Sequence, residues 1–369
     1  MDQIRKHVDD LGDGVYGISF TQWDGPVTHL TDPDDDVTAY VNNFPLSALG
    51  LPFPVKTVFL SSLTELDRMG PNVDLVSYQE APSAAGATAP SPTKVAFKYW
   101  FMHNGSMFLT WDELNCWSRL PRDHPHIVPF DSVVLDPHTH GIVGFTTRYI
   151  PGGTLHANNA TKRPFRLGWL RQLLSAVDDL NCRYGVMHQD IAPRNILIDE
   201  RDNLRILDFD DAIMIGKDYT PDLDDAKGVV FTLYEIITLD EHFRELPHKQ
   251  QDPEVVLTME TWAKHPDVKL DADVAEFRAV LGEWVAQRKA REFFQPTETW
   301  VRWTEMPEPP VVTVPTYEYH KGGGKTITGT KTGPRDVVTR QQLVDLGAEY
   351  WDWERPASYK LREALPEED

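Results

Sequence analysis

The stretch Val186-Met-His-Gln-Asp-Ile-Ala-Pro-Arg-Asn-Ile-Leu-Ile-Asp199 places an aspartate and an asparagine, Asp190 and Asn195, between two apolar runs. A second stretch follows closely, Leu204-Arg-Ile-Leu-Asp-Phe-Asp-Asp-Ala212, in which an apolar run leads into three carboxylates. The apolar runs are of β type, so we expect a short hairpin between the two polar groups. The alternative is a chance coincidence of Asp and Asn residues in unrelated loops.

These two stretches resemble the catalytic loop and the metal-binding segment of the protein-kinase superfamily, His-x-Asp-x-x-x-x-Asn and Asp-Phe-Gly. The spacing makes chemical sense, because phosphoryl transfer needs one carboxylate beside the attacking hydroxyl and separate oxygens that hold Mg²⁺ on the phosphates. The resemblance implies that Asp190 is the base or the hydroxyl-orienting carboxylate. It implies Asn195, Asp208 and Asp210 as metal ligands, with ATP and Mg²⁺ as cofactors.

Upstream residues fit the same resemblance. Val95-Ala-Phe-Lys98 is similar to the strand motif whose lysine contacts the nucleotide phosphates, and Glu113 lies fifteen positions later on a predicted helix. The resemblance implies that Glu113 pairs with Lys98 and keeps it charged and aimed. Taken alone, each residue is more typical of a surface charge.

The segment Phe145-Thr-Thr-Arg-Tyr-Ile-Pro-Gly-Gly-Thr-Leu155 resembles the connection between the two kinase lobes. By this resemblance the backbone groups of Arg148 and Ile150 meet adenine, and Thr147 lies at the back of the pocket. Downstream, Asp225 aligns with a buried aspartate that receives backbone donors from the catalytic loop. The alternative for Asp225 is an ordinary aspartate at the amino terminus of a helix.

The chain departs from protein kinases in four places. No Gly-x-Gly-x-x-Gly precedes Val95, so fewer backbone amides are expected to cradle the phosphates. Gln189 replaces the arginine beside the catalytic aspartate, which argues against control by a phosphorylated activation loop. Asp210 replaces the glycine of Asp-Phe-Gly, and Leu207-Asp-Phe-Asp-Asp-Ala212 looks like aminoglycoside- and choline-kinase relatives, in which an acidic pair serves the metals.

The fourth departure concerns the acceptor. Only 14 residues separate Asp210 from Asp225, whereas protein kinases place an activation loop, a peptide-docking strand and an Ala-Pro-Glu segment in this interval. At about 3.5 Å per residue the interval is too short for all three. The sequence therefore favours a small-molecule acceptor, or a protein acceptor that is held differently.

The order of predicted elements indicates an α+β, bilobal, protein-kinase-like fold with a small sheet-rich N-lobe and a larger helical C-lobe. We predict an N-terminal extension (1–55), an N-lobe (56–147), a C-lobe (148–305), and a linker with an aromatic C-terminal tail (306–369). The predicted strands are 56–63, 73–79, 94–100, 127–135 and 141–150, and the predicted helices are 111–120, 167–183, 225–239, 273–290 and 340–353.

Composition limits the classes of function. The chain of 369 residues has a net charge of −21, which repels nucleic-acid phosphates and anionic lipid, so we expect no nucleic-acid or membrane partner. Two cysteines, Cys116 and Cys182, exclude a disulfide framework and a cysteine-built zinc site. The amino terminus lacks an apolar core typical of a secretory signal, so we expect a cytoplasmic protein.

We interpret several other motifs as loops, linkers or structural residues and not as functional sites. We interpret the acidic run Asp32 to Asp36 as a solvated loop, the insert 81–92 as a mobile segment, and Gly322-Gly-Gly-Lys-Thr326 as a flexible linker in preference to a phosphate-binding loop. His124 and His126 are expected to have structural roles in preference to binding metal.

The leading hypothesis is ATP- and Mg²⁺-dependent phosphoryl transfer to a hydroxyl of a small molecule. One alternative is a protein Ser/Thr/Tyr kinase with a protein acceptor. Another is a pseudokinase-like binding or scaffold protein, motivated by the missing glycine-rich loop. A third is a kinase-fold enzyme that transfers an adenylyl or aminoacyl group.

Overall fold

A computed structural model gives the structure of the chain, and it describes residues 15, 17–20, 27–31, 38–41, 43–70, 72–80, 91–100, 107–218, 223–290, 296–320, 324–335, 337–351 and 353. The chain divides into two compact units. The first comprises Met1–Phe108, Asp131–Thr147 and Met306–Asp369, and the second comprises Leu109–Phe130 and Arg148–Glu305. The helical unit thus includes residues 109–130 as well as 148–305.

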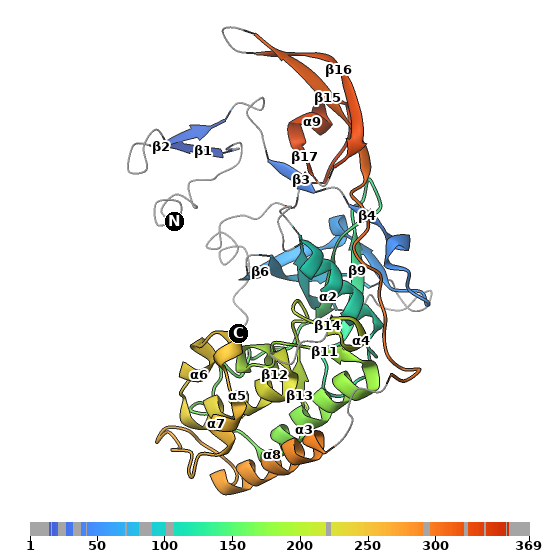
Figure 1. The fold of residues 1–369 in the computed structure, drawn as a ribbon. Helices are drawn as coiled ribbons and strands as arrows, with labels where there is room; N and C mark the ends of the chain where they lie inside the picture. Colours follow the sequence, from blue (N-terminus) through green and yellow to red (C-terminus); the bar gives the residue numbers. More distant parts are fainter. Residues whose placement is uncertain are drawn as a thin grey trace. The chain divides into compact units, whose positions relative to one another are not determined.

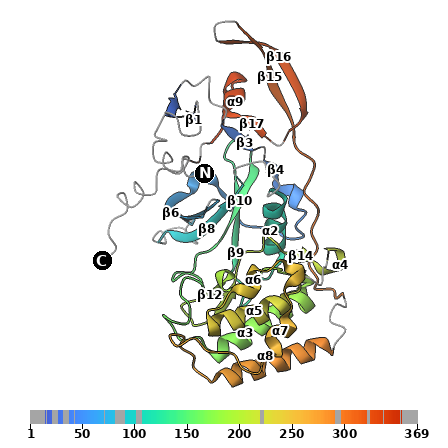
Figure 2. The same ribbon diagram turned by 60° about the vertical axis from the view of Figure 1, so that its left-hand side comes forward.

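The first unit is built on a seven-stranded sheet, of which β4, β6, β8, β9 and β10 are labelled in Figure 2. Its strand order is β5-β9-β10-β8-β7-β6, with β4 paired to β10. The strands are β4 (Phe44–Pro45), β5 (Thr57–Phe59), β6 (Thr64–Gly70), β7 (Val73–Tyr78), β8 (Thr93–Tyr99), β9 (Phe130–Leu135) and β10 (Gly141–Arg148). Val95, Phe97 and Tyr99 alternate along β8 and are buried in one cluster, because alternate side chains of a strand point to the same face.

Segments from both ends of the chain add to the first unit. β1 (Gly17–Phe20) pairs with β2 (Val27–Leu30), and β3 (Ala39–Val41) pairs with β17 (Val337–Thr339), so residues almost 300 positions apart form one antiparallel ladder. β15 (Val311–Tyr319) and β16 (Lys325–Pro334) form a hairpin, and α9 (Arg340–Asp345) follows β17.

The second unit is helical, with α3 (Leu167–Asp178), α5 (Asp225–Thr238) and α8 (Val274–Lys289) packed against one another (Figure 1). α5 is apolar on nearly all sides and is buried along most of its length, as expected for a central helix. The other helices of this unit are α2 (Met107–Arg119), α4 (Ile215–Asp218), α6 (His242–Glu245) and α7 (Pro253–Leu257).

Two short antiparallel pairs position the polar stretches of the second unit. β12 (Ile196–Ile198) pairs with β13 (Leu204–Ile206), which is the hairpin predicted between the two motifs. β11 (Val186–Met187) pairs with β14 (Ile213–Met214), so the start of the first motif and the end of the second are joined. Both motifs are therefore held at their ends by backbone hydrogen bonds.

Most predicted elements are present with ends shifted by a few residues, and the structure differs from the prediction in four places. The predicted strand 56–63 turns into a 3₁₀ helix at Leu60, and β6, with its polar sequence Thr-Glu-Leu-Asp-Arg-Met-Gly, was not predicted. The predicted helix 167–183 changes after Asp178 into a π-helix (Asp179–Tyr184) that ends at Gly185. The predicted linker after residue 306 is wrong where β15 and β16 form a hairpin.

The fourth difference is in the tail, where the predicted helix 340–353 ends at Asp345, and Gly347 has a φ of 68°.

Three predicted segments lie wholly or partly outside the described residues: Asp32 to Asp36, residues 81–90 of the predicted insert, and Gly322 and Gly323. Within the described part of the chain, no helix has the length and apolar character needed to cross a membrane.

Candidate active site

The loop that carries Asp190 is anchored on a buried carboxylate at the start of α5. Asp225 is 1% exposed, and its oxygens accept hydrogen bonds from the backbone N–H groups of His188 (2.9 Å) and Gln189 (2.7 Å) and from Asn181 Nδ2 (2.7 Å). Asp224, one residue earlier, is the residue that caps the helix, by accepting from Ala226 N–H at 2.7 Å. The predicted anchoring role of Asp225 is thus confirmed, and the alternative of a helix-capping aspartate applies to its neighbour.

The anchored backbone is held in an uncommon conformation. Gln189 has a φ of 66°, in the left-handed region that residues with a Cβ rarely adopt. Its N–H bond to Asp225 offsets this strain, and His188 adds a second constraint because its Nε2 lies 3.0 Å from the carbonyl oxygen of Leu207. The side chain of His188 therefore connects the two motifs.

The carboxylate of Asp190 is fixed by two neighbours on its own loop. Asn195 Nδ2 donates to Asp190 Oδ2 at 2.6 Å and to the Asp190 carbonyl oxygen at 3.0 Å. Arg194 forms an ion pair with Asp190 Oδ1. Because Asn195 uses its amide nitrogen in these contacts, its amide oxygen is the atom that suits a metal ion.

The second motif begins with another strained residue. Asp208 has a φ of 67°, and the backbone before it is tied to the first motif because Leu207 N–H donates to the carbonyl oxygen of Asn195 at 3.1 Å. Phe209 is completely buried between the rings of His188 (4.8 Å) and Trp117 (5.0 Å). The buried carboxylate of Glu113 accepts from Phe209 N–H at 3.3 Å, so α2 also contacts this motif.

The carboxylates of the two motifs are close enough to influence one another. Burial raises the pKa of Asp211, and the negative charges of Asp190 and Asp208 raise it further. Carboxylates crowded in this way favour a bound cation. Carboxylate and amide oxygens are hard ligands, and Mg²⁺ is commonly held by one or two carboxylates together with substrate phosphates and water.

Asn195, Asp208 and Asp210 therefore fit Mg²⁺ by ligand type, and their role as ligands stays a prediction. Among the described residues no group of three or more His, Cys, Asp or Glu side chains is arranged to hold a metal ion without other ligands.

The remaining predicted site residues lie on the expected elements. Lys98 is on β8 in the first unit and Glu113 is on α2 in the second, and their pairing stays a prediction. Thr147 is buried near the end of β10, and Ile150 is buried just after it. The Arg148 N–H donates to the Pro129 carbonyl oxygen at 3.0 Å, so a contact of Arg148 with adenine falls to its carbonyl group.

The turn that takes the place of a glycine-rich loop is short. Gly70 of β6 pairs with Val73 of β7, so only two residues close this hairpin. Such a turn offers few backbone N–H groups to a phosphate chain. The phosphates would therefore depend more on Lys98 and on the metal ligands.

Sequence reasoning missed the polar network behind the anchor. Arg288 of α8 donates to Asn181 Oδ1 at 2.8 Å and forms an ion pair with Asp178 at 2.7 Å, and Asn181 in turn donates to Asp225. Nothing in the local sequence connects Arg288 with Asn181 and Asp178, which lie more than 100 positions before it. Arg194 was noted in the sequence, but its contact with Asp190 was not predicted, although spacing of four residues could have suggested it.

The two histidines after α2 have structural surroundings, as predicted. His124 Nε2 lies 3.1 Å from Asp179, and His126 Nδ1 lies 3.2 Å from the carbonyl oxygen of Leu204. Burial lowers the pKa of both imidazoles, which keeps them neutral near pH 7.

Comparison with known proteins finds one matching family over part of the chain. Residues 89–234 match the protein kinase domain family. Over this region the chain is similar to the protein-kinase-like superfamily.

Curated relatives are named as protein kinases. The chain is 37% identical over 89 residues to CBL-interacting serine/threonine-protein kinase 2 of Arabidopsis thaliana, which covers 23% of this chain and 19% of the relative. It is 36% identical over 94 residues to CBL-interacting protein kinase 5 of Oryza sativa subsp. japonica, covering 25% and 19%. It is 31% identical over 142 residues to CBL-interacting protein kinase 12 of the same rice, covering 38% and 24%.

The matched part of this chain thus corresponds to about a fifth to a quarter of the length of these relatives. The relatives support a kinase, and they favour the protein kinase alternative over the small-molecule acceptor that the sequence suggested.

Proposed function

We propose that this protein kinase-like chain transfers the γ-phosphoryl group of ATP to a serine or threonine hydroxyl of a protein. The single observation that carries the proposal is the fixed carboxylate of Asp190, held by Asn195 and Arg194 on a loop that Asp225 anchors. The names of the relatives support the class of acceptor.

In this reaction Asp190 would position the acceptor hydroxyl and receive its proton. The acceptor oxygen attacks the γ-phosphorus, the bond from that phosphorus to the β–γ bridging oxygen breaks, and ADP leaves with the bond's electron pair. The hydroxyl proton passes to the Asp190 carboxylate. Two donors on that carboxylate fix its direction, so it can position the hydroxyl for attack.

The other residues would serve the phosphoryl donor. Asn195, Asp208 and Asp210 would hold Mg²⁺, which supplies neutralisation of phosphate charge when bound. Lys98 would contact the α- and β-phosphates, and Glu113 would keep its ammonium group aimed. The backbone of Arg148 and Ile150 would meet adenine beside Thr147.

The test uses the purified full chain, Mg²⁺ and γ-labelled ATP, with dephosphorylated casein as acceptor. We expect label in protein, and we expect Asp190→Asn and Asp208→Asn each to reduce the rate at least about a hundredfold while the far-UV spectrum is unchanged. Asp202→Asn is the matched control, because Asp202 is a surface carboxylate paired with Arg163 and should leave the rate unchanged. Full turnover by Asp190→Asn, or a wild-type chain that labels no protein, contradicts the proposal.

A small-molecule acceptor is the second candidate, and a specific observation favours it. Among the residues described, the 14 residues between Asp210 and Asp225 contain the short elements β14 and α4 and one 3₁₀ residue, Leu223, which leaves little chain for a peptide-docking platform. Incubation with a desalted mixture of metabolites bearing hydroxyl groups separates the candidates. Label that appears in a low-molecular-weight product and not in protein supports this candidate and overturns the first.

The binding or scaffold alternative makes a different prediction. A protein of that class would gain no thermal stability from Mg²⁺-ATP, whereas the proposed enzyme should show a rise in melting temperature that Asp208→Asn reduces. Intact-mass analysis of the products distinguishes a phosphoryl group from an adenylyl or aminoacyl group.

A further inference from the structure

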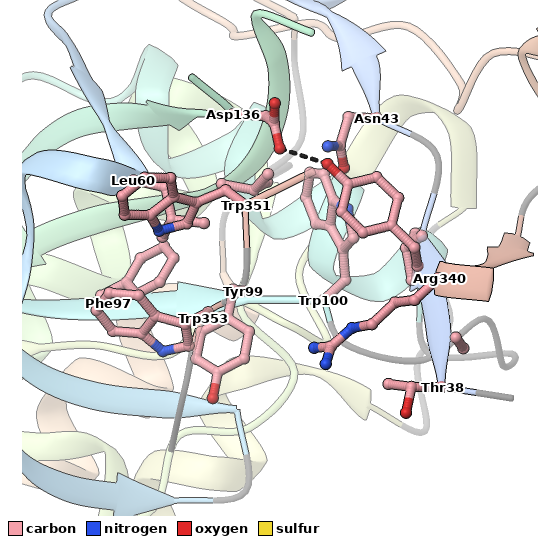
Figure 3. Close-up of a pocket in the computed structure, with 14 residues that line it drawn as sticks. Thr38, Asn43, Leu60, Phe97, Tyr99, Trp100, Asp136, Arg340, Trp351 and Trp353 are labelled. Carbon is pink, nitrogen blue, oxygen red and sulfur yellow. Dashed lines mark hydrogen bonds between the residues drawn. The ribbon is translucent and has the colours of Figure 1, made fainter. Parts of the chain in front are cut away.

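The first unit contains a cavity that the proposed phosphoryl transfer does not use. Its volume is about 280 Å³, and it lies where the β3–β17 ladder and the C-terminal segment meet the central sheet (Figure 3). The lining residues are Thr38, Ala39, Tyr40, Val41, Asn43, Leu60, Phe97, Tyr99, Trp100, Asp136, Val143, Arg340, Trp351 and Trp353. All of them belong to the first unit, and six of them are aromatic.

The cavity lies on the face of the sheet that does not carry Lys98. Successive side chains of a strand point to opposite faces, so Phe97 and Tyr99 of β8 face the cavity and Lys98 between them faces away. Trp353 closes this face, because its ring contacts Phe97 at 5.5 Å and its Nε1 donates to Asp74 Oδ2 at 3.1 Å. The cavity is therefore a separate site from the nucleotide phosphates.

The cavity wall contains a buried hydrogen-bond donor without an acceptor in the described part of the chain. Trp100 is 8% exposed, and its indole Nε1–H has no hydrogen-bond partner within the part of the chain that the structure describes. A buried unpaired donor is costly, so a ligand oxygen placed there would gain the hydrogen bond. Arg340, at the first position of α9, adds a guanidinium group to the same wall (Figure 3).

The polar groups of the cavity favour an anion over a cation. Asp136 is a carboxylate in the lining, but its Oδ2 accepts from the Tyr40 hydroxyl, and its Oδ1 accepts from the N–H groups of His138 and Thr139, both at 2.8 Å. These donors of the chain occupy both oxygens, so the carboxylate has little capacity left to ligate a cation. The positive charge of the Arg340 guanidinium would repel a cation, although aromatic walls alone can bind one.

We propose that this cavity binds a small aromatic carboxylate. The ring lies between the aromatic walls formed by Tyr99, Trp351 and Trp353, where its apolar faces are removed from water. The carboxylate accepts from Trp100 Nε1–H and from the fork of Arg340, a geometry that guanidinium groups provide for carboxylates. Residues from both terminal extensions build the site, which gives these extensions a role in binding.

The test compares three ligands that share one ring and differ in charge, 2-naphthoate, 2-naphthamide and 2-naphthylmethylamine. They are titrated calorimetrically into the full chain at neutral pH. We expect saturable binding of naphthoate, about tenfold weaker binding of the amide, and no binding of the amine. Absence of heat with naphthoate at millimolar concentration, or binding of the amine as tight as that of the acid, overturns the proposal.

Two substitutions identify the site. Trp100→Phe keeps an aromatic ring and removes the donor, and Arg340→Gln removes the charge, so each should weaken naphthoate binding about tenfold. Lys331→Gln is the matched control, because Lys331 is an exposed cation on β16 outside the cavity. If Arg340→Gln fails to fold by circular dichroism, Trp100→Phe still decides, since unchanged affinity in that variant overturns the proposed carboxylate contact.

Discussion

Replacing Asp225 by alanine should destabilise the chain far more than replacing its neighbour Asp224. The alanine leaves three buried donors without a partner, the N–H groups of His188 and Gln189 and the side-chain amide of Asn181. Each unpaired buried donor costs about 1 to 3 kcal/mol. Burial raises the pKa of Asp225, so removing a buried carboxylate returns part of that cost, and we expect a net loss of about 4 kcal/mol in the free energy of unfolding.

The assay is equilibrium urea unfolding followed by far-UV circular dichroism. Asp224→Ala removes only the helix cap to Ala226 N–H and should cost about 1 kcal/mol. Asp225→Asn should fall between the two variants, because one oxygen remains as an acceptor and the new amide group faces a donor. Equal losses for Asp224→Ala and Asp225→Ala would refute the anchoring role of Asp225.

Two further predictions concern other parts of the second unit. Burial raises the pKa of Asp199, but two backbone N–H donors and Arg205 (3.0 Å) lower it more. The ionised carboxylate therefore stabilises the fold above about pH 4, and this stabilisation is lost as the pH falls through the folded pKa. In urea unfolding, Asp199→Asn should cost about 2 kcal/mol at pH 7 and much less at pH 3, and a difference from the wild type that does not change with pH contradicts this. At Gly185, φ is 68° and an added Cβ would lie 2.3 Å from Trp300 Cδ2. Gly185→Ala should therefore lower the free energy of unfolding by about 2 to 3 kcal/mol. The control is Gly282→Ala, whose Cβ would meet no atom within 4 Å and which should not lower the free energy of unfolding.

The two motifs were predictable because their contacts are local in sequence. Asp190 and Asn195 are five residues apart on one loop, and the β12–β13 hairpin that follows is short, so a motif and two apolar runs were sufficient. The anchoring role of Asp225 was also predicted, because the apolar pattern of 225–239 indicates a helix and the resemblance to kinases places a buried aspartate at its start. The partners behind that anchor depend on packing between α3 and α8, and no local pattern encodes such contacts.

The hairpin of β15 and β16 shows how a local signal can mislead. Prolines and glycines predicted a linker, yet Pro315 lies within β15 opposite Thr330. A two-stranded hairpin has two edges, and proline is tolerated where its missing N–H would face away from the partner strand. The alternation of Val, Thr and Tyr along 311–319 was the better guide. The cavity beside β17 was not predictable at all, because its walls combine segments near both ends of the chain with strands of the central sheet.

The family match and the short interval before α5 bear on different halves of the reaction. The matched region, 89–234, contains Lys98 and both motifs, all of which would serve the phosphoryl donor or the hydroxyl proton in the proposed reaction. An acceptor platform would have to come from the interval between Asp210 and Asp225, where this chain has 14 residues. The relatives therefore support the donor chemistry more strongly than the acceptor. If label enters protein, the acceptor must be held by surfaces outside that interval, and variants in the surrounding helices, not in the interval, should then change the Michaelis constant for the protein substrate.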